Sequence, residues 1–105
     1  MRKARSASCY LNSVVYCIES NDGAHKYVGC TNNLDYRKKH HKYRCTFVNG
    51  KNYNLKIYRI IRENGGLDNF NWRVLENCSC VNFKELSRRE KYYIEVINPD
   101  MNTHR

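Results

Sequence analysis

The stretch that decides the fold is Ser13-Val14-Val15-Tyr16-Cys17-Ile18-Glu19, which is followed by the turn sequence Ser20-Asn21-Asp22-Gly23 and a second run from His25 to Thr31. The first run has the two-residue period of a strand, whose side chains point alternately to the two faces of a sheet. Asn, Asp and Gly between two such runs favour a tight turn. The segment therefore predicts a β-hairpin that carries Tyr16 and Tyr27 on strands about 4.8 Å apart.

Helix and strand signals follow the hairpin. Thr31, Asn32 and Asn33 offer N-caps for a basic helix of about two to three turns that begins at Leu34. The later elements are a helix near 54–64 ended by Gly65-Gly66, a strand over 70–76, and a helix to about Asn98 that starts from a capping pattern of Asn82 and Glu85. The order β-β-α-α-β-α predicts an α+β fold with a small three-stranded antiparallel sheet flanked by helices. With 105 residues, the chain is expected to be a single domain over 1–105 with a core of about 13–103.

The charge of the chain favours a polyanionic partner. Nineteen Lys and Arg face ten Asp and Glu, which gives a net charge of +9, and nucleic acid is the leading candidate. A solvated basic surface without a partner is the alternative. No membrane partner is expected, because no basic stretch accompanies a wide apolar helical face. The start at Met1 to Arg5 has the charge of a signal peptide, but Asn12 and Ser13 interrupt the apolar run, so an intracellular protein is expected.

Six cysteines stand at positions 9, 17, 30, 45, 78 and 80. A disulfide framework would need an oxidising compartment, which no export signal supports. Zinc is disfavoured because the only close pair, Cys78-Ser79-Cys80, lacks the spacing of a zinc knuckle. Cys17 and Cys30 alternate with strand residues and are expected to be small buried thiols.

Two constellations join the hairpin to the basic helix. Tyr16 and Tyr27 can address one small site from neighbouring strands, and Gly29 leaves space there in which a phosphate or a backbone could approach. Arg37 and His41 are four residues apart and share a helical face with Leu34. Arginine grips phosphate oxygens in pairs, and histidine can carry a proton near neutral pH.

The remaining cations of the basic helix are expected to contact nucleic acid. They are Lys38, Lys39, His40, Lys42 and Arg44. His40 competes with His41 for the catalytic role, but it points about 100° away from His41 and off the Leu34 face. A simple solvated basic run is the alternative for these residues.

Glu90 is the most unusual position on the last helix. Apolar residues form a stripe along this helix, and Glu90 projects at its centre; the stripe consists of Phe83, Leu86, Tyr93, Ile94 and Ile97. A carboxylate that faces a core is costly unless it is paired or binds a metal. A buried ion pair, for example with Arg37, is one explanation. Ligation of a hard divalent cation is favoured, because Mg²⁺ often takes one or two protein carboxylates and completes its shell with water and phosphate.

Taken in order and spacing, these residues resemble the GIY-YIG nuclease superfamily from about Ser13 to Thr103. The matching residues are Val14-Val15-Tyr16, the run from Tyr27 to Leu34, Arg37, His41, Glu90 within Arg89-Glu90-Lys91-Tyr92-Tyr93-Ile94, and Asn102 within Met101-Asn102. Val14-Val15 replaces the Gly-Ile of the first signature and Val28 replaces the isoleucine of the second. These departures remove no chemical group.

The resemblance implies a DNA endonuclease that uses Mg²⁺ or Mn²⁺ and one-metal in-line attack of water on double-stranded or branched DNA. It implies that Glu90 holds the metal and that Arg37 stabilises the negative charge that builds on the phosphate. It makes Tyr16 the general base, lets Tyr27 and His41 orient water and relay its proton, and has Asn102 position the site. A phenol has an unperturbed pKa of about 10, so the site is expected to lower that of Tyr16. The alternative is a catalytically silent nucleic-acid-binding module with the same fold, against which the intact polar set argues.

Overall fold

The computed structural model describes residues 10–103, so Cys9 and the basic start at Met1 to Arg5 lie outside the described residues. The chain forms a three-stranded antiparallel sheet with helices in the predicted order β-β-α-α-β-α. The elements are β1 (Ser13–Ser20), β2 (Lys26–Thr31), α2 (Leu34–Thr46), α3 (Lys56–Glu63), the short 3₁₀ helix η1 (Leu67–Asn69), β3 (Phe70–Cys78) and α4 (Phe83–Ile97).

The hairpin strand β1 lies in the centre of the sheet, whose order is β2-β1-β3. In the register with β2, Tyr16 stands opposite Gly29 and Ile18 opposite Tyr27. Residues that stand opposite each other in an antiparallel pair share a face, so Tyr16 and Tyr27 lie on the same face of the sheet. The register with β3 shifts between Val15 and Tyr16. The extra residue is Leu75 of β3, which has no partner on β1, so the bulge bends β3 beside the β1 residue that enters the candidate site.

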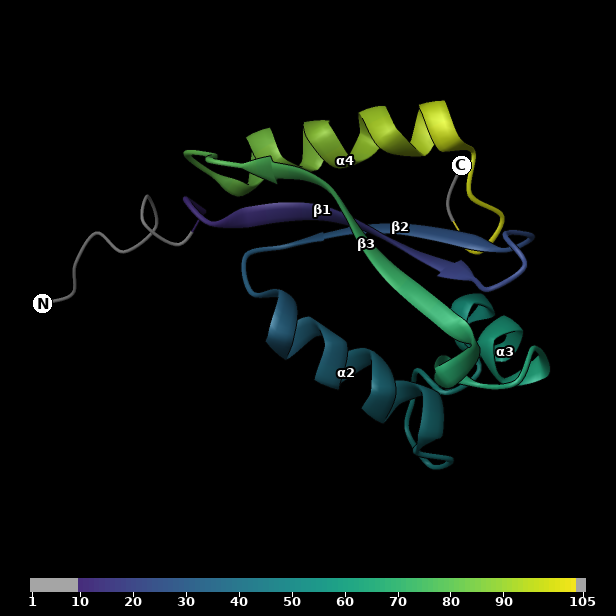
Figure 1. Ribbon diagram of the computed structural model, residues 1–105. Coiled ribbons are helices and arrows are strands. Elements are labelled where there is room, and N and C mark those ends of the chain that lie inside the picture. The colour runs from purple at the N-terminus through teal and green to yellow at the C-terminus, as the bar shows by residue number, and fades with distance from the viewer. Residues whose placement is uncertain (1–9, 104–105) are drawn as a thin grey trace, which may run out of the picture.

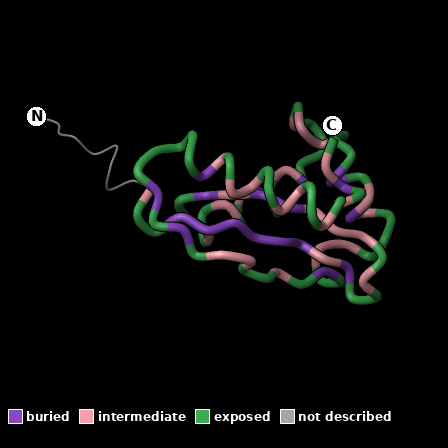
Figure 2. Tube along the Cα trace, turned by 90° about the horizontal axis from the view of Figure 1, so that it is seen from above, coloured by how far each residue is buried: buried purple, intermediate pink, exposed green. Residues whose placement is uncertain are grey.

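The helices form a layer on each side of the sheet (Figure 1): α4 covers one face, and α2 and α3 cover the other. Alternate residues of β1 therefore enter two different cores. Tyr16 and Ile18 belong to the core with α3, and Val15 belongs to the core with α4. Figure 2 shows a nearly continuous buried run along the central strand, and seven of its eight residues are buried. Strand β1 thus fixes the position of both helical layers.

Local signals explain where the elements begin and end. The Asn33 side chain accepts a hydrogen bond from the Tyr36 N–H and caps α2. This helix has 13 residues, which is longer than the two to three turns expected, because the helical backbone continues through the polar run to Thr46. Gly65 and Gly66 adopt φ of 95° and 88° and end α3, as predicted.

The last helix corrects one expectation from the sequence. Its cap is confirmed, since Asn82 accepts from the Glu85 N–H, although the Glu85 carboxylate accepts from the Val81 N–H and not from Asn82. Leu86 is buried as expected, but Phe83 is 57% exposed. Phe83 is the first residue of the helix and its ring contacts Tyr10 at the end of the molecule, 6.4 Å between centroids. The apolar stripe therefore begins at Leu86.

The segment after α4 returns to the outer edge of β2. Asn98 ends the helix in the left-handed conformation, with φ of 54°. The Met101 N–H then donates to the Lys26 carbonyl, and the Asp100 carboxylate accepts from the Lys26 N–H. These bonds satisfy backbone groups that an edge strand would otherwise expose.

The described cysteines are free thiols, and four of the five are buried: Cys17, Cys45, Cys78 and Cys80 are buried and Cys30 is partly exposed. Within residues 10–103, none of the helices combines the length and the apolar character that crossing a bilayer requires.

Candidate active site

The Tyr16 ring lies over Gly29 of the neighbouring strand. A Cβ atom on residue 29 would lie 2.5 Å from the Tyr16 hydroxyl oxygen and 2.6 Å from Cζ. The space above Gly29, which the sequence suggested for a phosphate or a backbone, is therefore filled by the Tyr16 phenol. The missing side chain at Gly29 permits a tyrosine on the central strand to reach the edge strand.

Tyr16 is the first member of a buried hydrogen-bonded chain. Its hydroxyl lies 2.9 Å from His41 Nε2, and His41 Nδ1 lies 2.7 Å from the hydroxyl of Tyr58. The exposed fractions are 1% for Tyr16, 2% for His41 and 1% for Tyr58. The three side chains come from β1, α2 and α3, so the chain of bonds ties both helices to the centre of the sheet.

Burial keeps His41 neutral. It lowers the pKa of His41 to about 3, and the positive charges of Arg37 and Arg44 act in the same direction. A histidine that titrates near neutral pH was expected here, and the structure corrects that expectation. The imidazole is a hydrogen-bond partner between two phenols at neutral pH.

The two phenols of the hairpin are also neutral. Burial raises the pKa of Tyr16 well above its usual range, and the neighbouring Tyr27 adds to this while Arg37 opposes it. Burial likewise raises the pKa of Tyr27 to about 12, with a further contribution from the charge of Glu90. The expected lowering of the Tyr16 pKa is therefore not met in the protein alone.

Arg37 projects from α2 into this cluster. Its positive charge lowers the pKa of both hairpin tyrosines and of His41 and Cys30, against or beside the larger effect of burial, so the guanidinium is close enough to act on all four groups. Its Nε atom is buried and has no hydrogen-bond partner among the described residues. A buried donor without an acceptor is costly, and an anionic oxygen is the acceptor that a guanidinium binds best.

Glu90 approaches the same edge from the other helical layer. It lies on α4 and is partly buried. Burial and, as the second cause, the charge of Glu90 raise the pKa of Tyr27 and of the Cys30 thiol, each to about 12. The edge strand β2 thus has Tyr27 and Arg37 on one side and Glu90 on the other. Glu90 is the carboxylate here that could hold a hard divalent cation, which needs few protein ligands when water and phosphate complete its shell.

Asn102 lies on the backbone of the edge strand. Its Oδ1 accepts from the Val28 N–H and its Nδ2 donates to the Val28 carbonyl, both at 2.9 Å. Val28 follows Tyr27 directly. Asn102 therefore holds the strand segment that carries Tyr27. The hydrogen bonds described for its side chain both go to Val28 and none reaches the aromatic cluster.

The other cations of α2 do not share one surface. The Lys38 ammonium lies 5.5 Å from the centre of the Trp72 ring. Arg44 faces Tyr58 and lowers its pKa, whereas burial, the larger effect, raises it. Lys39 and Lys42 are exposed, and His40 stacks on Tyr36 with ring centroids 4.9 Å apart. Lys38 and Arg44 thus lie beside the cluster, while Lys39 and Lys42 project into solvent.

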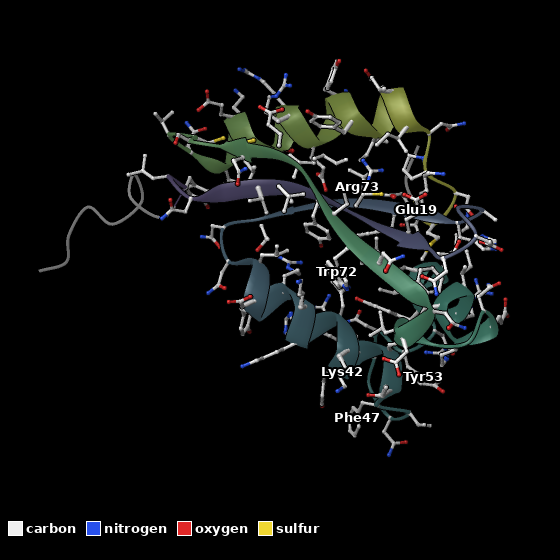
Figure 3. All side chains as sticks on the ribbon, viewed as in Figure 1. Glu19, Lys42, Phe47, Tyr53, Trp72 and Arg73 are labelled. Atoms are coloured by element: carbon white, nitrogen blue, oxygen red, sulfur yellow. The ribbon has the colours of Figure 1, made fainter. Side chains whose placement is uncertain are left out.

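Sequence reasoning missed two aromatic members of the site. Tyr58 completes the hydrogen-bonded chain. Trp72 of β3 lies on the α2 side of the sheet (Figure 3), and its ring centroid is 5.3 Å from that of Tyr16 and 5.6 Å from that of His41. Tyr58 stands between Ile57 and Ile61 on the apolar face of α3, which was a usable signal of burial. Trp72 alternates with outward residues on its strand, but nothing local indicates which ring it meets.

This sheet edge thus brings together two phenols, a partly buried guanidinium and a carboxylate. A sequence model of the GIY-YIG catalytic domain matches residues 12–103, nearly the whole chain. The chain therefore belongs to the GIY-YIG nuclease family. No curated protein and no solved structure gives a significant match.

Proposed function

We propose that the protein is a divalent-metal-dependent endonuclease that hydrolyses phosphodiester bonds of DNA, with Mg²⁺ or Mn²⁺ held by Glu90. The observation that carries the proposal is the position of Arg37, whose charge acts on Tyr16, Tyr27 and His41 and whose buried Nε has no partner among the described residues. A scissile phosphate would supply the missing acceptor and would bring the reacting phosphorus next to both phenols.

In this proposal Arg37 binds the phosphate and stabilises the negative charge that grows on its oxygens. A guanidinium stays charged at every relevant pH and can donate two hydrogen bonds to one phosphate. Because Arg37 is partly buried, this charge acts at short range in a site with little water, where it is worth more than at an exposed position.

The hydrogen-bonded chain sets the tautomer of His41. Arg44 lies beside Tyr58, where its positive charge lowers the pKa of the phenol against the larger effect of burial, and the buried Tyr58 O–H needs an acceptor. His41 Nδ1 at 2.7 Å is that acceptor. The proton then sits on Nε2, which donates to the Tyr16 oxygen. The Tyr16 O–H is left to point toward the substrate.

This tautomer gives Tyr16 and His41 distinct roles. As Tyr16 loses its proton, the Nε2–H bond to its oxygen strengthens and stabilises the phenolate. The chemistry is then in-line hydrolysis. The Tyr16 hydroxyl first gives its proton to solvent, and the phenolate then takes a proton from a water whose oxygen bonds to phosphorus. The bond from phosphorus to the leaving sugar oxygen breaks, and that oxygen takes a proton from solvent. Tyr27, on the same face, orients that water. His41 acts as a hydrogen-bond donor and keeps its own proton.

A divalent cation on Glu90 would supply Lewis-acid polarisation of the phosphate and charge neutralisation at the leaving oxygen. Glu90, Tyr27 and Arg37 lie near one another at the edge of β2, so the carboxylate and the guanidinium are suited to hold a cation and a phosphate side by side. Asn102 holds the backbone beside Tyr27 and acts as a positioning residue.

The proposal is tested by incubating the protein with supercoiled plasmid and with branched DNA, with Mg²⁺, with Mn²⁺ and with a chelator. Cleavage is expected with either metal and lost with the chelator. Glu90→Gln keeps the shape of the side chain and removes the charge that binds the cation, so it should abolish cleavage and leave DNA affinity within about twofold. Near-wild-type cleavage by Glu90→Gln would overturn the metal assignment. DNA binding without cleavage by the wild-type protein under all these conditions would establish the catalytically silent module instead.

A further inference from the structure

The outer face of α2 and its C-cap residue carry a stripe of four aromatic side chains, of which three are exposed and His40 is partly buried. The four residues follow one another at intervals of four, three and four, which places them on one helical face, away from Arg37 and His41. They are Tyr36, His40, Tyr43 and Phe47. Tyr36 is 58% exposed, Tyr43 56% and Phe47 42%. The rings pair along the stripe: Tyr43 stacks on Phe47 with centroids 5.0 Å apart. So many large rings on one exposed face indicate a binding surface.

A pocket of about 280 Å³ opens at the C-terminal end of this stripe. Rings and cations from α2 and from the loop that follows it line the pocket, namely His40, Tyr43, Arg44, Phe47, Lys51 and Tyr53. Arg62 packs against the Tyr53 ring, with its Cζ 3.6 Å from the ring centre. Figure 3 shows Phe47 and Tyr53 near the C-terminal end of α2. This volume is just below the usual range for small-ligand sites and suits one flat heterocycle with its phosphate.

The chemistry of the lining favours a nucleobase over a protein side chain. No Asp or Glu lines the pocket, and Arg44 and Lys51 add positive charge to aromatic faces. Flat π-systems that carry negative charges stack on such rings and pair with such cations, and this is how proteins bind single-stranded nucleic acid. A base inside a duplex must first be unpaired and unstacked at a cost in free energy before it can enter a pocket, whereas an unpaired base avoids most of this cost.

Arg44 connects this pocket to the candidate active site. It lines the pocket and also faces Tyr58, the last member of the chain that begins at Tyr16. We propose that the pocket between Tyr43, Phe47 and Tyr53 binds an unpaired nucleobase and its phosphate. The substrate is then DNA with a single-stranded or branched segment. This inference rests on the proposed nuclease function, whose substrate class it specifies.

The test measures binding of labelled DNA by fluorescence anisotropy, in a chelator so that no cleavage occurs. Three probes are compared: a single-stranded oligonucleotide, the same strand built from abasic nucleotides, and the matched duplex. The wild-type protein should bind the single strand about tenfold more tightly than the abasic strand, as expected for loss of base stacking. This comparison needs no variant and is independent of any folding defect.

Variants then locate the effect. Tyr43→Ala should weaken binding of the single strand about tenfold, with abasic binding and the salt slope unchanged, because stacking releases no counterions. Tyr43→Phe should bind like the wild type. Tyr92→Ala is the matched control, since Tyr92 is 48% exposed on α4 across the sheet, and it should change nothing.

Each outcome decides between the proposals. Equal wild-type affinity for normal and abasic strands, or a Tyr43→Ala protein that matches Tyr92→Ala, overturns the base pocket while the nuclease proposal stands. Failure of the wild-type protein to bind any of the three probes removes DNA as the partner and overturns both. If Tyr43→Ala alters self-association by analytical ultracentrifugation and not DNA affinity, the stripe is a protein interface and the base pocket is again overturned.

Discussion

A Cβ atom on any larger residue at position 29 would lie 2.5 Å from the hydroxyl oxygen of Tyr16. The glycine of the second strand and the tyrosine of the first are thus one structural unit. Glycine at position 29 leaves the space that the Tyr16 ring occupies where its hydroxyl meets His41.

Gly29→Ala should therefore displace the Tyr16 ring. Overpacking of a buried site of this kind costs about 1–3 kcal/mol, because the ring must rotate away or the strands must separate. Thermal or urea unfolding measures the cost. In a Tyr16→Ala background the same Gly29→Ala change should cost much less, and additive costs in the double variant would show that the two residues do not compete for space.

His41 should make the protein sensitive to mild acid. Its pKa is about 3 in the folded state and near 6.5 when unfolded, so between these values the unfolded chain binds the extra proton. Stability is then complete above about pH 6.5 and falls as the pH drops, by up to about 1.4 kcal/mol per unit. Urea unfolding at pH 7 and pH 5 measures the slope.

His41→Gln is the control for this slope. The carboxylates whose pKa is lowered, such as Glu76 and Asp100, lose their contribution only as the pH approaches their unfolded values near 4, below this window. The variant should therefore be less stable at pH 7 and nearly flat from pH 7 to pH 5. An unchanged slope in the variant would assign the acid sensitivity to other groups.

The Tyr58–His41 bond predicts a single imidazole tautomer. Nitrogen NMR of the labelled protein should show His41 with Nδ1 unprotonated and Nε2 protonated at neutral pH. Tyr58→Phe removes the donor to Nδ1 and should mix the tautomers, with a cleavage rate about tenfold lower and a similar melting temperature. A packing role for Tyr58 would leave both the tautomer and the rate unchanged in the phenylalanine variant, and a protonated Nδ1 in the wild type would contradict the assignment.

The sequence predicted the sheet, the helix order and the aromatic hairpin because these depend on local signals: a two-residue period, turn residues, caps and glycines. It also indicated Arg37, His41 and Glu90, which the fold brings to the β2 edge. It could not indicate that Tyr58 binds His41, since this contact joins two helices and depends on how α3 packs. The pKa of His41 was mispredicted for the same reason, because burial is a property of the assembled layers.

The basic helix should separate into binding and catalytic cations. Lys39 and Lys42 are exposed, so replacing both with alanine should weaken binding to any DNA and reduce the salt slope by about 0.9 for each phosphate that is no longer neutralised. Arg37→Ala removes a partly buried charge next to Tyr16 and Tyr27 and should mainly lower the single-turnover rate of bound DNA. A variant of Arg37 that only weakens binding, with an unchanged single-turnover rate, would make this residue a backbone contact.

The two hairpin tyrosines should differ in how much their hydroxyls matter. Tyr16→Phe keeps the ring over Gly29 and removes the group that His41 Nε2 contacts at 2.9 Å, so packing is preserved while the proposed base is lost. The single-turnover rate should fall by about 10²-fold or more, and the melting temperature should change little. Tyr27→Phe should slow cleavage less, because solvent can replace an orienting hydroxyl on the edge strand. If the rings served packing alone, phenylalanine would be fully active at both positions and only alanine would be harmful, through the cavity it leaves. Four variants, with phenylalanine and alanine at each position, distinguish the two cases when their single-turnover cleavage and thermal unfolding are measured. A stable Tyr16→Phe protein that cleaves at the wild-type rate would rule out Tyr16 as the general base.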